Sequence, residues 1–341
     1  MSSPPGRGRG GSVHIMEMQM QAQGKFTWTT FKNMFVFLVL ALIVVGFSAR
    51  SLNFLNPDNL INILRMSVPI LCACSGATLI MISGNIDLSV GSIVSLSGVM
   101  YCLMLKNGFG FFSSIVLTLA LGVSMGFING LLVMKWRIVP VIATLVTLYL
   151  FRGIAWTLTP RQIGLIKGNM PEGINDFARA PVFLGLPWAF YTAVLLIAVM
   201  VIVQRKTILG KYAAAIGGNR TAAELSGINV VGMVWLLYII TGLLCSVGGI
   251  ARASYLSMGD PQTGNLMELE VIIAVLLGGT AFAGGEGSVL KTAIGALIIM
   301  CVSVGMMVLW IPPYWQSLAK GLVLIGTLVI YTLITERVEE S

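Results

Sequence analysis

Apolar residues in this chain occur in long continuous runs, which short polar breaks separate. Such breaks stand at 106–108 (KNG), 135–137 (KWR) and 204–206 (QRK). About 20 apolar residues in helical conformation cross the hydrocarbon core of a bilayer, whereas the strands of membrane barrels alternate apolar and polar positions. The pattern therefore predicts an all-α polytopic membrane protein with about ten transmembrane helices. The predicted segments are 33–48, 68–84, 88–105, 111–135, 140–159, 188–204, 233–254, 270–283, 290–311 and 318–335.

The composition agrees with a chain that is largely embedded in membrane lipid. Hydrophobic residues make up 57% of the sequence and charged residues 10%, and the mean hydropathy is +0.92. Soluble domains carry about 25% charged residues, so most of the outer surface should face lipid. The net charge of +8 is ascribed to basic residues that hold helix ends at the cytoplasmic face, and no nucleic-acid partner is expected.

The distribution of basic residues predicts the orientation and three regions of the chain. Most Lys and Arg residues fall on the side of the N-terminus, so both termini should be cytoplasmic. Residues 1–32 form a tail that is expected to be disordered because it begins with a Pro/Gly/Arg-rich stretch. Residues 33–335 form the transmembrane domain, and 336–341 a second cytoplasmic tail.

Small residues within the apolar runs predict close helix packing. Gly122, Gly126 and Gly130 form a continuous GxxxGxxxG pattern, which is favoured here as an intramolecular contact over a dimer face. The five cysteines all lie in apolar runs, and the single histidine is His14. They are expected to be packing residues, and no metal site is predicted.

Residues 84–91 (GNIDLSVG) interrupt the apolar pattern between two predicted spans. Asn85, Asp87 and Ser89 are of types that cap helix N-termini, and the flanking glycine Gly91 permits a broken helix. Capping is the favoured interpretation of this helix break. A polar lining of a transport pathway is the open alternative, because broken helices are tolerated where the backbone lines a cavity.

The polar loop 205–232 contains a predicted short helix at about 221–226. Gly217 and Gly218 end the preceding element, Thr221 and Glu224 have the spacing of a capping box, and Gly227 suits the position after a helix end. Such a short helix is not stable alone. It should pack either on a cytoplasmic partner protein or on the underside of the bundle.

Two further features bear on chemistry. The Gly-rich stretch 278–288 lacks the Gly-Lys-Ser/Thr of a Walker loop, so it is interpreted as a helix break and not as a nucleotide site. Arg152 lies inside a predicted span and must face a partner or a cavity. No hydrolase or metalloprotease pattern is present, so the chain is expected to be neither an enzyme nor the carrier of a cofactor.

Three motifs resemble signatures of one family. ISGNIDLSVGS (82–92) is similar to the ISGGIDLSVGS signature of bacterial sugar ABC-transporter permeases of the ribose, galactose, arabinose, xylose and autoinducer-2 type, with Asn85 in place of a glycine. AIGGNRTAAELSGI (215–228) resembles the cytoplasmic loop of that family. LGGTAFAGGEGS (277–288) resembles a third motif, with Ala281 where serine is common. The resemblance covers about residues 33–335.

The resemblance implies a bundle like that of a type II ABC importer permease in the bacterial inner membrane. It also implies a dimer with a second permease subunit, a separate cytoplasmic ABC ATPase that uses the ATP, and a periplasmic binding protein that delivers a pentose, hexose or related sugar. The 215–228 loop would hold the coupling helix that contacts the ATPase. The residues expected there are Gly217, Gly218, Asn219, Ala222, Ala223, Glu224 and Gly227.

Two alternatives stay open at this stage. Permeases for branched-chain amino acids resemble this group, but their loop usually reads SEN where this chain has GGN at 217–219. An ion-coupled secondary transporter would need carboxylates at mid-depth in the membrane, and the predicted spans lack them apart from Asp87.

Overall fold

The computed structural model describes residues 34, 36–159, 175–312, 314–323, 325, 326 and 329. Over these residues the chain is helical, with one isolated β-bridge between Phe183 and Leu186. Six helices are long and apolar enough to cross a membrane. They are α2 (Pro57–Ile82), α4 (Phe111–Gly130) with its π-helical extension Leu131–Lys135, α5 (Pro140–Leu158), α6 (Trp188–Lys206), α9 (Val230–Leu256) and α11 (Val289–Val308).

Shorter helices complete the described bundle. Val36–Arg50 and α3 (Val90–Lys106) are apolar, and α10 (Met267–Leu277) has 11 residues. A short 3-10 turn, Leu52–Leu55, precedes α2. The all-α polytopic membrane fold is thus confirmed, whereas the count of about ten spans stays a prediction. The two tails, 1–32 and 336–341, lie outside the described residues.

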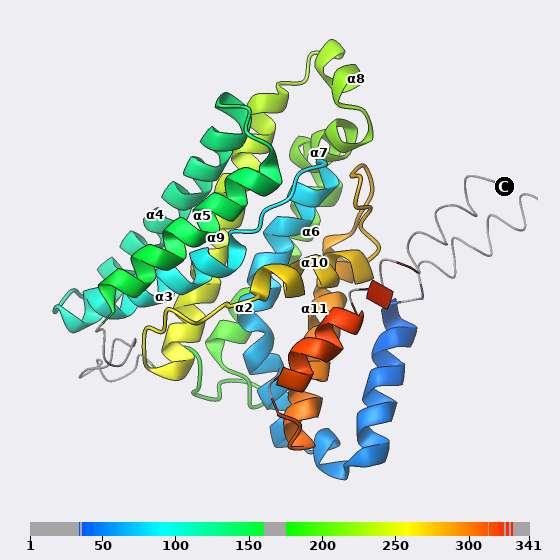
Figure 1. Ribbon diagram of the computed structural model, residues 1–341. Coiled ribbons are helices and arrows are strands. Elements are labelled where there is room, and N and C mark those ends of the chain that lie inside the picture. Colours follow the sequence, from blue (N-terminus) through cyan, green and yellow to red (C-terminus); the bar gives the residue numbers. More distant parts are fainter. Residues whose placement is uncertain are drawn as a thin grey trace, which may run out of the picture.

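Helices α2 and α9 form the centre of the bundle. Figure 1 shows α4 and α5 on one side of α9, and α11 on the other side of α2. The most apolar stretch of α2 is 83% buried, against 22% for that of α6. Exposed apolar side chains such as Phe112 and Leu195 therefore cover the outside of the bundle, as expected of helices that face lipid.

Glycines bring α4 into backbone contact with α9. A Cβ atom at Gly126 would lie 2.2 Å from the carbonyl oxygen of Tyr238, and one at Gly122 would lie 2.6 Å from that of Gly242. Gly130 leaves room for the indole of Trp235 in the same way. Lipid provides no hydrophobic drive for helix association, so this close contact supplies the attraction. The predicted intramolecular role of the GxxxGxxxG pattern is confirmed.

The second predicted span, 68–84, starts too late, because α2 begins at Pro57. The side chain of Asn56 accepts a hydrogen bond from the Asp58 amide at 3.1 Å, and Pro57 occupies the first helical position. Both are typical helix starts. The polar residues that follow lower the hydropathy of the first turns without ending the helix.

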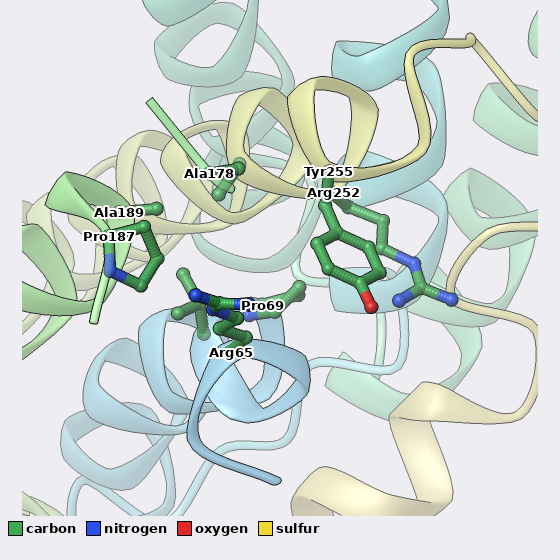
Figure 2. A pocket seen from close by; sticks show the side chains of 9 residues that line it. Arg65, Pro69, Ala178, Pro187, Ala189, Arg252 and Tyr255 are labelled. Carbon is green, nitrogen blue, oxygen red and sulfur yellow. The ribbon is translucent and has the colours of Figure 1, made fainter. Parts of the chain in front are cut away.

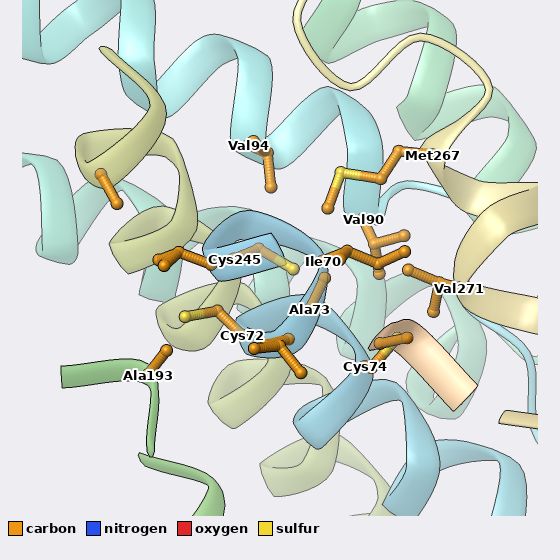
Figure 3. Close-up of a cluster of buried hydrophobic side chains, with 14 of the residues drawn as sticks. Ile70, Cys72, Ala73, Cys74, Val90, Val94, Ala193, Cys245, Met267 and Val271 are labelled. Atoms are coloured by element: carbon orange, nitrogen blue, oxygen red, sulfur yellow. The ribbon is translucent and has the colours of Figure 1, made fainter. Parts of the chain in front are cut away.

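The cysteines are packing residues, as predicted. All five are free and buried. Figure 3 shows Cys72 and Cys74 of α2 and Cys245 of α9 among apolar side chains, with Val90 and Val271 nearby. A buried cysteine in such surroundings behaves as a small apolar side chain.

Candidate functional site

The predicted short helix in the 205–232 loop exists as α8 (Arg220–Leu225), after a separate helix α7 (Ile208–Gly218). The N-cap is Asn219 and not Thr221, because the Asn219 Oδ1 accepts a hydrogen bond from the Ala222 amide at 2.9 Å. Glu224 pairs with Arg220 at 3.3 Å instead of closing a capping box. Gly227 has φ +81°, the left-handed conformation expected just after a helix end.

Helix α8 protrudes from the bundle. Figure 1 shows it at one extreme of the molecule, beyond α7. Within α8 only Ala223 is buried, whereas Leu225 is 85% exposed. A six-residue helix with an exposed leucine contributes little burial to the fold, so its surface is available to another molecule.

Three Gly-rich segments from distant parts of the sequence meet beside α7. The Gly285 amide donates to the Ile82 carbonyl oxygen at 2.8 Å. A Cβ atom at Gly217 would lie 1.9 Å from that same oxygen and 2.5 Å from the Gly285 nitrogen. Gly84 and Gly284 complete the contact, with φ values of +74° and +93°. We call these five residues the glycine junction.

The glycine junction joins the end of α7 to two helix breaks. One break separates α2 from α3, and the other, at 278–288, separates α10 from α11, which confirms the predicted break there. Gln204 at the end of α6 clamps the second break: its Nε2 donates to the Gly287 carbonyl at 2.8 Å, and its Oε1 accepts from the Val289 amide at 2.9 Å. No pattern in the sequence predicts this role of Gln204.

Gly218 differs from Gly217 although both were expected to contact the ATPase. Apart from the adjoining backbone of its own helix, no atom of the described residues lies within 4 Å of a Cβ added at Gly218. Of the two neighbouring glycines, only Gly217 is therefore required by packing within this chain.

The segment 83–89 is held by a buried polar network. Asp87 Oδ1 accepts from the Ser89 amide at 2.8 Å and from the Ser89 hydroxyl at 2.6 Å. Asn129 of α4 donates to Ser89 Oγ at 2.7 Å, and Thr147 of α5 donates to Asn129 Oδ1 at 2.6 Å. Buried polar groups need such partners. The network fixes the start of α3 against α4 and α5.

This geometry modifies the expected capping. Asp87 stabilises the turn before α3 by binding Ser89, which is the N-cap residue but makes no side-chain cap bond of its own. The prediction that Asn85 caps the next helix is wrong. Its side-chain amide instead donates to the Ser83 carbonyl at 3.0 Å, and the N-cap of α3 is Ser89. Gly91 allows close approach, because a Cβ atom there would lie 2.3 Å from the Gly264 carbonyl oxygen.

The partners of Arg152 are backbone carbonyls. Its guanidinium donates to Pro261 at 3.2 Å, to Thr263 at 3.4 Å and to Gly264 at 2.9 Å. Ser95 of α3 also donates to the Pro261 carbonyl, at 2.9 Å. The segment before α10 is thus fixed by α3 and α5, which satisfies a charge that would be costly in lipid.

Three further arginines, Arg65, Arg179 and Arg252, lie near Tyr255 at the end of α9. Arg65 donates to the Gly185 carbonyl at 2.8 Å, and Arg179 donates to the Tyr255 carbonyl at 2.6 Å. Figure 2 shows Arg65, Tyr255 and Arg252 around a small pocket. That pocket holds about 10 Å³, which is at most one water molecule, so it does not suit a solute.

The apolar helices, the broken spans and the protruding α8 define a polytopic membrane permease. The chain matches the family model described as "Branched-chain amino acid transport system / permease component" over residues 59–328. It belongs to this family, and is therefore an integral inner-membrane transport component.

Curated relatives extend this result. The chain is 37% identical to the ribose import permease protein of Bacillus subtilis (strain 168), over 85% of this chain and 89% of the relative. It is 34% identical to the ribose import permease protein of Escherichia coli (strain K12), over 88% and 92%. The galactofuranose transporter permease protein of the same strain is 32% identical, over 90% and 91%. No solved structure matches the chain significantly. The resemblance to sugar ABC-transporter permeases is confirmed.

Proposed function

We propose that this chain is the membrane-spanning subunit of an ATP-driven importer that translocates a simple sugar delivered by a periplasmic binding protein. The relatives that support a sugar substrate are permeases for ribose and galactofuranose, each aligned over most of its length. The observation that carries the coupled mechanism is the protruding α8, which α7 links to two helix breaks through the glycine junction.

In this proposal α8 is the coupling helix and a cytoplasmic ABC ATPase is its partner. The expected contact residues are Gly218, Asn219, Ala222, Glu224 and Gly227, whose surroundings in this chain leave them accessible or at the helix ends. Ala223 is buried and Gly217 lies in the glycine junction, so these two would support the contact from behind. ATP would bind the partner, and this chain would need no cofactor of its own.

The proposed topology has ten spans with both termini in the cytoplasm. Four segments would join the six long helices: Val36–Arg50, α3, α10 and 318–335. Eleven residues of α10 rise only about 16 Å, about half of the hydrocarbon core. The Gly-rich break after α10 would complete the crossing inside the protein, where irregular backbone is tolerated. A second permease subunit, identical or related, would complete the pathway.

The description of the family names the substrate of a second candidate, a permease for branched-chain amino acids. The relatives aligned over most of the chain favour the sugar. The loop sequence GGN at 217–219, where amino-acid permeases usually have SEN, also favours the sugar.

Reconstitution tests the proposal directly. The chain should be placed in proteoliposomes with a candidate ABC ATPase and a candidate sugar-binding protein of the same organism, and uptake of labelled D-ribose and L-leucine compared. We expect ATP-dependent ribose uptake that stops when the ATPase is omitted. Uptake by this chain alone would contradict an ABC importer, and uptake of leucine but not of any sugar would establish the second candidate.

A further inference from the structure

A cavity of about 230 Å³ lies on the side of the bundle away from α8, near the C-terminal ends of α9 and α11. Its wall includes Pro69, which stands halfway along α2 and 13 residues before Ile82, or about 20 Å along the helix axis. Drug-sized ligands occupy pockets of about 300 Å³ or more, so this volume suits a smaller solute. The cavity is distinct from the glycine junction and from the network of Asp87.

Residues with hydrogen-bond donors and residues with hydrogen-bond acceptors both line this cavity. The polar residues of its wall include Arg252, Glu270, Lys320, Asn265, Gln316 and Ser303. Methionine and other apolar side chains fill the rest of the wall. Such a polar lining inside a membrane protein is costly unless the groups have partners, and it is typical of a solute pathway.

Arg252 has donors that this chain does not use. Among the residues that the structure describes, no hydrogen bond or ion pair reaches its guanidinium, whose one specific contact is with the ring of Tyr255, at 5.8 Å. Arg65, Arg152 and Arg179 all donate to backbone carbonyls. A guanidinium offers five N–H donors in a fixed plane, so Arg252 presents several of them to the cavity.

The one carboxylate in the cavity wall is already paired. Glu270 forms an ion pair with Lys320, on the last described helical segment. These two residues, together with Asn265, also line a second cavity of about 160 Å³. The ion pair is therefore shared by the walls of two neighbouring cavities.

We propose that the 230 Å³ cavity is a holding site for a neutral polyhydroxylated solute, and that Arg252 is its principal hydrogen-bond donor. The mixture of donors and acceptors matches hydroxyl groups, which both donate and accept. A free amino acid would need an unpaired carboxylate for its ammonium group, and Glu270 is engaged by Lys320. This inference rests on the proposed function and adds to it a solute site within the chain.

Substitution of Arg252 tests the site in the assembled transporter. In proteoliposomes with ATPase and binding protein, Arg252→Gln should lower D-ribose uptake about tenfold, the effect of losing hydrogen bonds to a charged donor. ATP hydrolysis stimulated by the loaded binding protein should persist, and Arg252→Lys should recover part of the uptake. Arg179→Gln is the matched control, because Arg179 contacts the same Tyr255 ring without lining the cavity, and it should transport normally.

Cysteine labelling gives an independent measurement that does not depend on transport. Thr263→Cys places a thiol in the cavity wall, while the native thiols are buried. D-ribose should slow labelling by a small thiol reagent, and L-leucine and acetate should not. Normal uptake by Arg252→Gln, or protection by acetate rather than by ribose, would overturn the inference. If the unmodified transporter imports no sugar, the proposed function fails, and labelling with a panel of polyols still decides the cavity.

Discussion

Gly217→Ala should break the contact that joins α8 to the helix breaks. The added Cβ would lie 1.9 Å from the Ile82 carbonyl oxygen and 2.5 Å from the Gly285 nitrogen. Both neighbours are backbone atoms, so no side chain can rotate away. Overpacking of this kind costs about 1–3 kcal/mol, of which the helix-stabilising effect of alanine offsets about 0.5–1 kcal/mol. Helix α8 itself is unchanged, so the substitution should impair the mechanical coupling between α8 and the two helix breaks.

Gly218→Ala is the matched control for the packing effect, which the Tm measures. It introduces the same methyl group one residue later, where no atom from another part of the described structure lies within 4 Å. Thermal unfolding in detergent should show a lower Tm for Gly217→Ala and an unchanged Tm for Gly218→Ala. In proteoliposomes, Gly217→Ala should retain the bound ATPase but import less sugar per ATP hydrolysed. Equal Tm values for the two variants, or a coupling ratio of Gly217→Ala equal to that of the unmodified chain, would refute the role of the glycine junction.

Three other substitutions test separate parts of the site. Asn219→Ala removes the α8 cap and should cost about 1 kcal/mol, seen as weaker co-purification of the ATPase, whereas Asn219→Asp should retain binding. Arg152→Gln should lower the Tm, because the Thr263 carbonyl loses its donor at a cost of about 1–3 kcal/mol, whereas Ser95 still donates to the Pro261 carbonyl and the Met267 amide to the Gly264 carbonyl; an unchanged Tm would mean that the segment before α10 needs no anchor. Asp87→Ala should destabilise the protein by a similar amount, whereas Asp87→Asn keeps the Oδ1 acceptor for Ser89. Altered substrate preference of a normally expressed Asp87→Asn variant would instead favour a pathway role.

Hydropathy predicted the helical fold but not every helix start. The error at α2 arose because polar residues in its first turns lower the hydropathy, although they are helical. Asn56 followed by Pro57 was a usable start signal, since it joins a cap residue to the residue preferred at the first helical position. Local capping chemistry is thus better evidence for a helix end than the limit of an apolar run.

Two competing capping signals explain why the wrong residue was predicted as the N-cap of α8. Its position was predicted to within one residue, but two residues of capping type precede it, Asn219 and Thr221. The capping-box spacing favoured Thr221, whereas the extended backbone at Asn219 (φ −157°) places its side chain at the Ala222 amide. Glu224 was then free to pair with Arg220. Sequence spacing alone does not state which residue leaves the helical conformation.

Tertiary contacts could not be predicted from the sequence. Asn129 and Thr147 are two of several polar residues in otherwise apolar helices, and only the fold brings them to Ser89 and Asp87. Likewise nothing in the pair Gly217–Gly218 indicates that one glycine is packed and the other open. Such differences depend on which face of α7 meets the end of α2, and this is set by the packing of the bundle.

The meeting of the three motifs has a mechanical consequence under the proposed function. At the glycine junction, backbone contacts backbone, as in the hydrogen bond from the Gly285 amide to the Ile82 carbonyl. Flexible side chains can absorb a displacement by changing rotamer, but a backbone contact without side chains cannot. A force that the ATPase applies to α8 would therefore move both helix breaks together. The three motifs that resemble the family signatures lie far apart in the sequence, and each supplies one side of this contact.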